Sequence, residues 1–472
     1  MTITAPALVG RSWDDIKVGE SASLTRVCTA NDLLVFAHAS GNLNPVHLPG
    51  ESEQETGRAP VAPAMWCGSL FSAVFGNKLP GPGTVYRAQA LRFHARVEAG
   101  DAVIATATVR EKLPGNLLVM DCRLETANGT LVADGTAEIS PPQTRLVTDG
   151  VAIPELTLLR RGKFSRLLEA CRGLPAMPTA IAAPTDENSL GGAWEATKEG
   201  LIDPILVGPE AAIRAEAAKI GWDLDGVRIE ATADVHDAPE RAVALVHEGR
   251  AEAVMKGNIH SDEVLRHVTK SVGGLRAGRR ISHAFVLDIP GHERLMIISD
   301  AAINILPDLM TKADIVQNAI DLGRAIGIEE PRVGLLSAVE TINPAIPSTV
   351  DAAALAKMAE RGQIKGGLVD GPLAMDNAVD LEAARTKGIH STVAGRADVL
   401  VAPNLEAGNM LAKQLVFLSQ ADPGGLVVGA KVPVMLTSRA DDENARLMSA
   451  ALAVLYGYWR RTGKSRLAEI AA

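Results

Sequence analysis

Two apolar runs near the C-terminus constrain most strongly what this chain can fold into. Residues 397–402 and 426–436 are mostly apolar, and a helix-like segment that carries Lys413 separates them. Runs of this length without regular polar alternation are typical of strands buried on both faces, as in a parallel sheet covered by helices. This part of the chain therefore predicts a strand–helix–strand unit within an α/β fold.

Polar side chains follow both apolar runs. Asn404 comes soon after the first run, and the second run is followed by Ser438, Arg439, Asp441 and Asp442. In a parallel α/β sheet, ligands bind beyond the carboxyl ends of the strands, so we expect these residues to converge on one crevice. The arginine side chain suits a phosphate group there, because it offers two parallel charged hydrogen bonds.

The same alternation of apolar runs and helices begins much earlier, at Phe164. Strand-like runs separated by helix-like segments occur at residues 179–183, 204–207, 227–229 and 251–255. A strand–helix–strand order of this kind predicts a mostly parallel sheet with right-handed crossovers.

Polar and basic residues follow several of these predicted strands. Lys256 follows one strand and Arg266 lies in the next helix, so both are candidates to contact a phosphate group. For Arg266 alone, a solvated helix face is the commoner explanation. Ser299 and Asn304 follow another apolar run, and polar residues in that position favour a binding site.

Residues 1 to about 140 have a different pattern. Residues 31–40 predict a short helix with Asn31 as its N-cap, and residues 64–75 are apolar nearly all round, which predicts a buried helix. From Tyr86 onward, apolar and polar residues alternate as in antiparallel strands, and Asn128-Gly129 predicts a hairpin turn. One buried helix wrapped by an antiparallel sheet is therefore expected.

This N-terminal part resembles the MaoC-like enoyl-CoA hydratases, which have the hotdog fold. Their fingerprint is Ser-Gly-Asp-x-Asn-Pro-hydrophobic-His, and residues 40–47 read SGNLNPVH. The catalytic aspartate of that family falls on Asn42, and hydration of an enoyl thioester needs a base that an amide cannot replace. Pro63-Ala64 also stands where the family has a His-Gly pair that helps to form the oxyanion hole.

These departures lead to two alternatives for the N-terminal domain. In the favoured one, His47 is a structural residue, and the domain binds acyl-CoA or assembles the oligomer. In the other, His47 and a second base carry out (R)-specific hydration, so that the protein has two activities.

The rest of the chain, from about residue 155 to residue 472, resembles the phosphate acetyl/butyryltransferases. The resemblance is carried by residues 282–290, 299–320, 370–380, 402–415 and 436–441. It implies an α/β fold of the isocitrate/isopropylmalate dehydrogenase type, with a cleft between two subdomains, residues 155–298 plus 445–472 and residues 299–444. The whole chain is thus similar to a fusion with a hotdog domain at 1–145, a linker at 146–160 and a transferase domain at 161–472.

The implied reaction converts a short-chain acyl-CoA, with acetyl-CoA favoured, and phosphate into acyl phosphate and CoA. The resemblance implies that Arg439 binds phosphate and that Ser438 contacts the carbonyl or phosphate oxygens. Asp441 or Asp442 would be the base that deprotonates the CoA thiol, since the thiolate is the nucleophile. Substrate contacts are expected from six residues: Lys256, Arg266, Ser299, Asn304, Asn404 and Lys413.

One arginine of the family has no counterpart in this sequence. Its position, in the helix after the Ala-Gly-Asn motif, is occupied by Phe417. Lys413 or one of the arginines at 276, 279 and 280 is the candidate to replace it.

Composition narrows the remaining possibilities. The net charge of −9 does not favour nucleic acid or membrane as the main partner. The N-terminus lacks the pattern of a signal peptide, and the four cysteines are scattered without metal-site spacing, which indicates a cytoplasmic protein. We expect no metal and no cofactor other than CoA as substrate, and a homo-oligomer formed through both domains. A non-catalytic acyl-CoA-binding scaffold is the third alternative, against which the Ser438-Arg439 pair argues.

Overall fold

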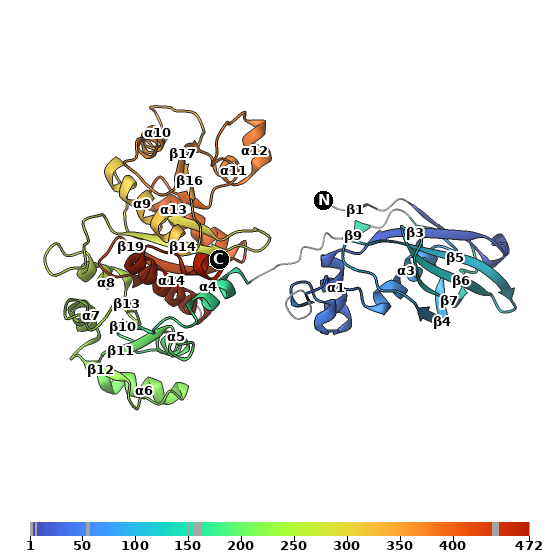
Figure 1. The fold of residues 1–472 in the computed structure, drawn as a ribbon, viewed down its shortest axis with the longest axis horizontal. Helices are drawn as coiled ribbons and strands as arrows, with labels where there is room; N and C mark the ends of the chain where they lie inside the picture. Colours follow the sequence, from blue (N-terminus) through green and yellow to red (C-terminus); the bar gives the residue numbers. More distant parts are fainter. Residues whose placement is uncertain are drawn as a thin grey trace. The chain divides into compact units, whose positions relative to one another are not determined.

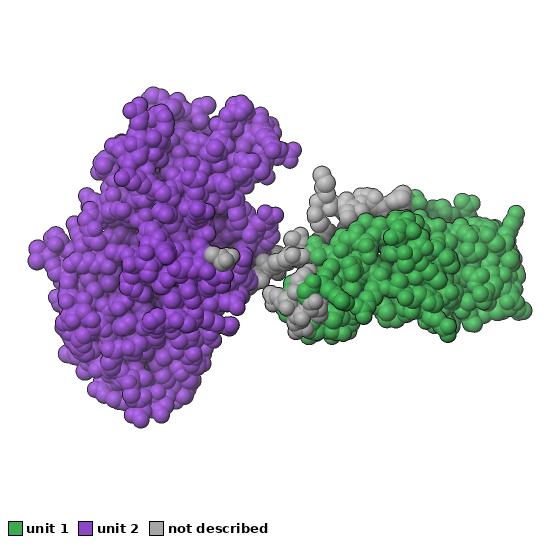
Figure 2. All heavy atoms as spheres, in the orientation of Figure 1, with its two compact units in different colours: residues 1–158 green, residues 159–472 purple. Residues whose placement is uncertain are grey.

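The computed structural model describes residues 3–4, 7–52, 57–148, 152–153, 162–436 and 443–471. The chain divides into two compact units, residues 1–158 and 159–472, each with a core of its own (Figure 2). The division falls inside the segment expected to be a linker.

Unit 1 is an antiparallel sheet wrapped around one helix (Figure 1). The helix α3 (Ala64–Asn77) buries Phe71 and Phe75, and successive side chains of the strands alternate between buried and more exposed positions. This is the architecture predicted from the sequence. In the order β3-β5-β6-β7-β4, the strands are β3 (Ser21–Val27), β5 (Ala102–Leu113), β6 (Leu117–Thr126), β7 (Leu131–Ser140) and β4 (Val85–Phe93).

Helix α1 (Ala30–Ser40) precedes the hydratase-like fingerprint. Thr29, not Asn31 as predicted, is its N-cap: the Thr29 hydroxyl accepts from the Asp32 N–H at 3.1 Å, and the Asp32 carboxylate accepts from the Thr29 N–H in return. The sequence prediction missed this reciprocal capping box. The smaller elements are β1 (Ile3–Thr4), β2 (Leu8–Gly10), β8 (Leu146–Thr148), β9 (Ala152–Ile153) and the 3-10 turns Trp13–Asp15 and Pro45–His47.

Unit 2 is built on one eleven-stranded sheet, in the order β12-β11-β10-β13-β20-β19-β14-β15-β18-β16-β17 (Figure 1). The four strands predicted between residues 179 and 255 are all present. The strands are β10 (Met177–Ala182), β11 (Ile202–Gly208), β12 (Arg228–Ala231), β13 (Ala253–Lys256), β14 (Ser282–Asp288), β15 (Met296–Ser299), β16 (Arg332–Leu336), β17 (Leu368–Leu373), β18 (Val399–Val401), β19 (Asp422–Val428) and β20 (Val434–Met435).

The strands of this sheet form two parallel groups that run in opposite directions. β10 to β13 and β20 are mutually parallel, and so are β15 to β18. β19 and β14 join the groups through three antiparallel pairings. The carboxyl ends of the first group are here called the first carboxyl edge, and those of the second group are called the second carboxyl edge. The two edges face opposite directions, but the pairing register sets Ser299, where β15 ends, level with Met435, where β20 ends.

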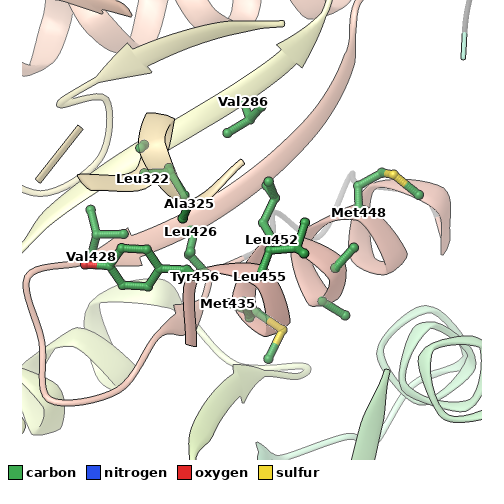
Figure 3. Close-up of a cluster of buried hydrophobic side chains, with 14 of the residues drawn as sticks. Val286, Leu322, Ala325, Leu426, Val428, Met435, Met448, Leu452, Leu455 and Tyr456 are labelled. Carbon is green, nitrogen blue, oxygen red and sulfur yellow. The ribbon is translucent and has the colours of Figure 1, made fainter. Parts of the chain in front are cut away.

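Helices cover both faces of the sheet. One face packs in a single core against the helices α4 (Lys163–Cys171), α5 (Glu187–Lys198), α6 (Glu210–Ile220), α9 (Leu309–Ala325), α10 (Pro347–Glu360) and α14 (Glu443–Thr462). Leu426 of β19 and Leu452 of α14 are among the buried residues of this core (Figure 3). The other face carries two separate cores, one beneath α7 (Ala238–His247) and α8 (Ser261–Val268) and one beneath α11 (Met375–Val379), α12 (Leu381–Thr386) and α13 (Leu405–Phe417). Within the described residues, no helix is both long enough and apolar enough to cross a membrane.

The helices of unit 2 are α4 (Lys163–Cys171), α5 (Glu187–Lys198), α6 (Glu210–Ile220), α7 (Ala238–His247), α8 (Ser261–Val268), α9 (Leu309–Ala325), α10 (Pro347–Glu360), α11 (Met375–Val379), α12 (Leu381–Thr386), α13 (Leu405–Phe417), α14 (Glu443–Thr462) and α15 (Arg466–Ala471), with a 3-10 turn at Val235–Asp237. The expected subdomain boundary needs one correction. β20, which was assigned to the second subdomain, is hydrogen-bonded to β13 of the first group.

Candidate active site

The first carboxyl edge leads directly into the residues expected to carry the chemistry. Met255 of β13 pairs with Met435 of β20, so the next residues, Lys256 and Leu436, lie level with each other where both strands end. Leu436 is the last residue described before the gap at 437–442. The predicted catalytic residues Ser438, Arg439, Asp441 and Asp442 thus lie outside the described residues.

Lys256 is a buried cation at this edge, with 2% of its surface exposed. Its Nζ donates to the carbonyl oxygens of Gly257 and Ile259, each at 3.2 Å. Gly257 is required by the tight packing here, because a Cβ at that position would be 2.4 Å from the Ala183 carbonyl oxygen. Carbonyl groups therefore hold the ammonium group in place beside the chain that leads to Ser438.

Three helices begin at the same edge. α5 follows β10, α8 follows β13, and α14 begins at Glu443, directly after the gap. The N-terminus of a helix has free N–H groups and a positive partial charge, which favours an anion. Together with Lys256, these helix ends make the first carboxyl edge suitable for a phosphate group.

Arg266 lies away from the start of α8. It is exposed in the last turn of that helix, where a positive side chain complements the helix dipole. In the described part of the chain it has no ion pair or side-chain hydrogen bond. This position is compatible with the solvated helix face that was the alternative reading of Arg266.

The segment after β15 is organised around a buried carboxylate. Asp300 accepts hydrogen bonds from the main-chain N–H groups of His283, Ala302, Ile303 and Asn304, at 2.9 to 3.2 Å. The side-chain amide of Asn304 donates to Asp300 and also to the Ile281 carbonyl oxygen at 3.0 Å. These bonds fix the loop between β15 and α9.

Ser299 has a structural position, which corrects the expectation that it contacts substrate. It is fully buried, and its hydroxyl donates to the His283 carbonyl oxygen at 2.8 Å. A polar residue at the end of an apolar run was interpreted as facing a ligand. Here its hydroxyl group instead forms a hydrogen bond to a carbonyl oxygen of the neighbouring strand.

The start of α13 docks onto this same loop. Asn404 is the N-cap of α13, its side-chain oxygen accepting from the Ala407 N–H at 2.9 Å. The Leu405 N–H donates to the Ile305 carbonyl oxygen at 3.1 Å, and the Asn409 side chain donates to the Ala301 carbonyl oxygen at 3.0 Å. The structure therefore brings Asn404 close to the Asn304 loop, at the second carboxyl edge.

The expected single crevice for Asn404 and Ser438 stays a prediction, because Ser438 lies outside the described residues. β18, which precedes Asn404, and β20, which precedes Ser438, run in opposite directions, but the pairing register sets Val401 at the end of β18 level with Met435 at the end of β20. Lys413 lies exposed on α13, the helix that leads from the second edge to the start of β19.

His283 is a buried group that the sequence reasoning missed. Its side chain is 1% exposed and packs edge-on against Phe285, with ring centroids 4.5 Å apart. Burial lowers the pKa of His283 to about 4, while the nearby Asp300 carboxylate acts to raise it, so the imidazole is neutral at pH 7. It lies in the 282–290 segment, which carried a family resemblance but no assigned chemistry.

In unit 1, His47 lines a cavity of about 450 Å³ near the start of α3, with Asn44, Ala64, Cys67 and Arg96 among the other lining residues. The His47 Nδ1 is 2.7 Å from the Val61 carbonyl oxygen, so in the neutral ring Nδ1 carries the hydrogen and Nε2 is the acceptor. Burial raises the pKa of the Cys67 thiol to about 11, so the thiol is neutral. The Asn42 side-chain oxygen accepts from the Asn44 N–H at 3.1 Å and holds the turn.

Comparison with known proteins identifies the larger unit. Residues 229–454 match a family model described as phosphate acetyl/butaryl transferase. The phosphate acetyltransferase of Rhizobium meliloti is 58% identical over 302 residues, which are 64% of this chain and 96% of that protein. The chain belongs to the phosphate acetyl/butaryl transferase family.

Two solved structures are also similar. A branched-chain phosphotransacylase from Enterococcus faecalis V583 is 30% identical and covers 59% of this chain and 98% of its own, with a TM-score of 0.52. R-hydratase PhaJ1 from Pseudomonas aeruginosa is 35% identical and covers 32% of this chain and 99% of its own, with a TM-score of 0.31. Membership of the transferase family confirms the resemblance seen in residues 155–472.

Proposed function

We propose that this protein transfers an acyl group between CoA and phosphate, interconverting a short-chain acyl-CoA plus phosphate with acyl phosphate plus CoA. The observation that carries the proposal is the pairing of β13 with β20, which sets a buried lysine level with the residue that leads into Ser438 and Arg439. Acetyl-CoA is the favoured substrate, since the relative with 58% identity is a phosphate acetyltransferase.

The proposed chemistry assigns one task to each group. A phosphate oxygen attacks the thioester carbonyl carbon, the C–S bond breaks, and the CoA thiolate leaves. Arg439 binds the phosphate, Ser438 contacts the carbonyl or phosphate oxygens, and Lys256 adds positive charge where anionic charge gathers. In the reverse direction Asp441 or Asp442 takes the proton from the CoA thiol before the sulfur attacks acyl phosphate.

The proposed cleft lies on the face of the sheet that carries two separate cores. His283 of β14 pairs with Val427 of β19, and Val427 belongs to the core beneath α8. Leu287 lies on the same face of β14 as His283, but it belongs to the core beneath α13. This arrangement supports two subdomains with a cleft between them, as in the isocitrate/isopropylmalate dehydrogenase type of fold. Arg266, Asn304 and Lys413 remain proposed substrate contacts from its two sides.

The test is phosphate- or arsenate-dependent release of CoA from acetyl-, propionyl- and butyryl-CoA by the full-length protein. Arg439→Ala is expected to lower kcat/KM at least about 100-fold, because a charged contact to the reacting phosphate is lost. The matched control is Arg361→Ala at the end of α10, an exposed arginine that is expected to leave the rate unchanged. Absence of acyl transfer with all three substrates would overturn the proposal and favour an acyl-CoA-binding scaffold.

For unit 1 we propose acyl-CoA binding or oligomer assembly rather than hydration. Its cavity is lined by His47, and position 42 holds an asparagine and no carboxylate. True bifunctionality, with (R)-specific hydration, is the competing proposal. The protein is further proposed to be cytoplasmic, to form a homo-oligomer through both units and to need no metal and no cofactor, with CoA as a substrate.

A further inference from the structure

We propose that Phe417 and Leu418, at the end of α13, form an apolar platform for the acyl chain and the pantetheine arm of acyl-CoA, and so determine which chain lengths are used. This inference rests on the proposed acyl-transfer function and deepens it. The residues assigned to the chemistry bind phosphate or move protons, so recognition of the alkyl chain is left to other residues.

Both side chains are unusually exposed for their size. Phe417 is 69% exposed and Leu418 is 79% exposed. Met410, which is 66% exposed, lies seven residues before Phe417 and thus on the same side of the helix, with Lys413 between them. Along this side of α13, the positive Lys413 therefore lies between two apolar side chains, Met410 and Phe417.

The direction of α13 brings this end of the helix to the start of β19. The helix starts at the second edge, where Leu405 is bonded to Ile305. Its 13 residues span about 20 Å, which is enough to cross the strands beneath it. The chain then turns and begins β19 at Asp422, and β19 is antiparallel to β20.

The pairing of β19 with β20 shows where β19 lies relative to the strand that leads into the candidate active site. Val427 pairs with Val434, which brings Gly425 level with Leu436. A Cβ on Gly425 would be 3.6 Å from the Leu436 carbonyl oxygen and 3.1 Å from His283 Nε2. β19 starts at Asp422, three residues before Gly425, and its start therefore lies about 10 Å further than Leu436 in the direction in which β20 runs.

An acyl-CoA matches this surface in chemistry. Its acyl chain and pantetheine arm are largely apolar, and its phosphates are anionic. Exposed Phe417 and Leu418 can cover the chain beside the reacting carbonyl, and Lys413 offers a positive charge one helical turn away. An exposed apolar helix face could also bind a second copy of the chain. The experiment below distinguishes binding of acyl-CoA from binding of a second copy.

The experiment compares two leucines of equal exposure beside opposite ends of α13. Leu418 and Leu306 are each 79% exposed, and Leu306 lies in the loop beside the start of α13. We measure kcat/KM with acetyl-CoA and butyryl-CoA, the KM for phosphate and the oligomeric state for Phe417→Ala, Leu418→Ala and Leu306→Ala. Phe417→Ala and Leu418→Ala should lower the butyryl-to-acetyl ratio at least about 5-fold, with the KM for phosphate unchanged, while Leu306→Ala leaves the ratio as it is.

Two results would overturn the inference. One is an unchanged chain-length ratio in both Phe417→Ala and Leu418→Ala. The other is a loss of oligomers on size-exclusion chromatography with unchanged kinetics, which would assign the surface to a second copy. Failure of the underlying function is distinguishable, because the unmutated protein would then show no phosphate-dependent CoA release with either substrate.

Discussion

Gly408 lies against the main chain of Asp300, so closely that a Cβ on Gly408 would be 2.2 Å from the Asp300 carbonyl oxygen. Asn409, the next residue of α13, donates from its side chain to the Ala301 carbonyl oxygen at 3.0 Å. Segments 402–409 and 299–305, more than 90 residues apart in the chain, thus form one packed corner. Their shared role is to fix where α13 begins, and hence how the helix lies on the sheet.

Gly408→Ala should destabilise this corner. The added methyl group meets a main-chain carbonyl oxygen that cannot move freely, so we expect a loss of about 1–3 kcal/mol in the free energy of unfolding of unit 2, measured by urea denaturation. The control is Gly76→Ala in helix α3, where a Cβ meets nothing within 4 Å. An unchanged midpoint for Gly408→Ala would contradict the close packing of α13 on the loop.

Lys256→Met should remove activity while the protein stays folded. Methionine keeps much of the volume of lysine but loses its charge and its hydrogen bonds to the Gly257 and Ile259 carbonyl oxygens, so circular dichroism is measured to check that the fold is retained. We expect kcat/KM for acyl transfer to fall at least about 100-fold, with circular dichroism unchanged. Lys357→Met, on the exposed surface of α10, serves as the control. Full activity of Lys256→Met would remove this lysine from the site.

His283 should make unfolding sensitive to mild acid. Its pKa is about 4 in the folded protein and 6.5 for the unperturbed side chain, so between these values the unfolded state binds more protons. Stability should therefore fall as the pH drops from about 6.5 towards 4, by at most about 3 kcal/mol from this residue. Urea denaturation between pH 7.5 and 5 should show a smaller pH dependence for His283→Gln than for the unmutated protein. Equal slopes would show that His283 is not buried in the neutral form.

Asn42→Asp should reveal whether the cavity of unit 1 lacks only its carboxylate. Aspartate has the shape of asparagine and can keep the hydrogen bond from the Asn44 N–H, so the turn should remain intact. We expect no crotonyl-CoA hydration by the unmutated protein, and measurable hydration by Asn42→Asp that disappears when His47→Ala is added. Hydration by the unmutated protein that His47→Ala abolishes would favour the bifunctional alternative.

The sequence predicted the strands well and their directions only in part. Residues 179–183 and 251–255 were recognised as strands because buried strands are apolar throughout, and they correspond to β10 and β13. An apolar run looks the same in either direction, however. The antiparallel pairings of β14 and β19, which set the carboxyl ends of the two groups level with each other, therefore could not be foreseen.

The burial of polar residues was the other feature that the sequence did not predict. Ser299 satisfies a carbonyl group of the neighbouring strand, and Asp300 gathers main-chain N–H groups, so their polarity organises the fold. Such roles depend on which strands become neighbours, which the local sequence does not specify. Lys256 was named as a candidate because it directly follows a predicted strand, and its contact with phosphate stays a prediction.

Transfer of an acyl group from CoA to phosphate is tested best by measuring both products at once. With acetyl-CoA and phosphate, acetyl phosphate, followed by phosphorus NMR, should appear in equal amount to the free CoA thiol, and Arg439→Ala should abolish both. Release of CoA without acetyl phosphate would indicate hydrolysis of the thioester and would overturn the proposed acyl transfer.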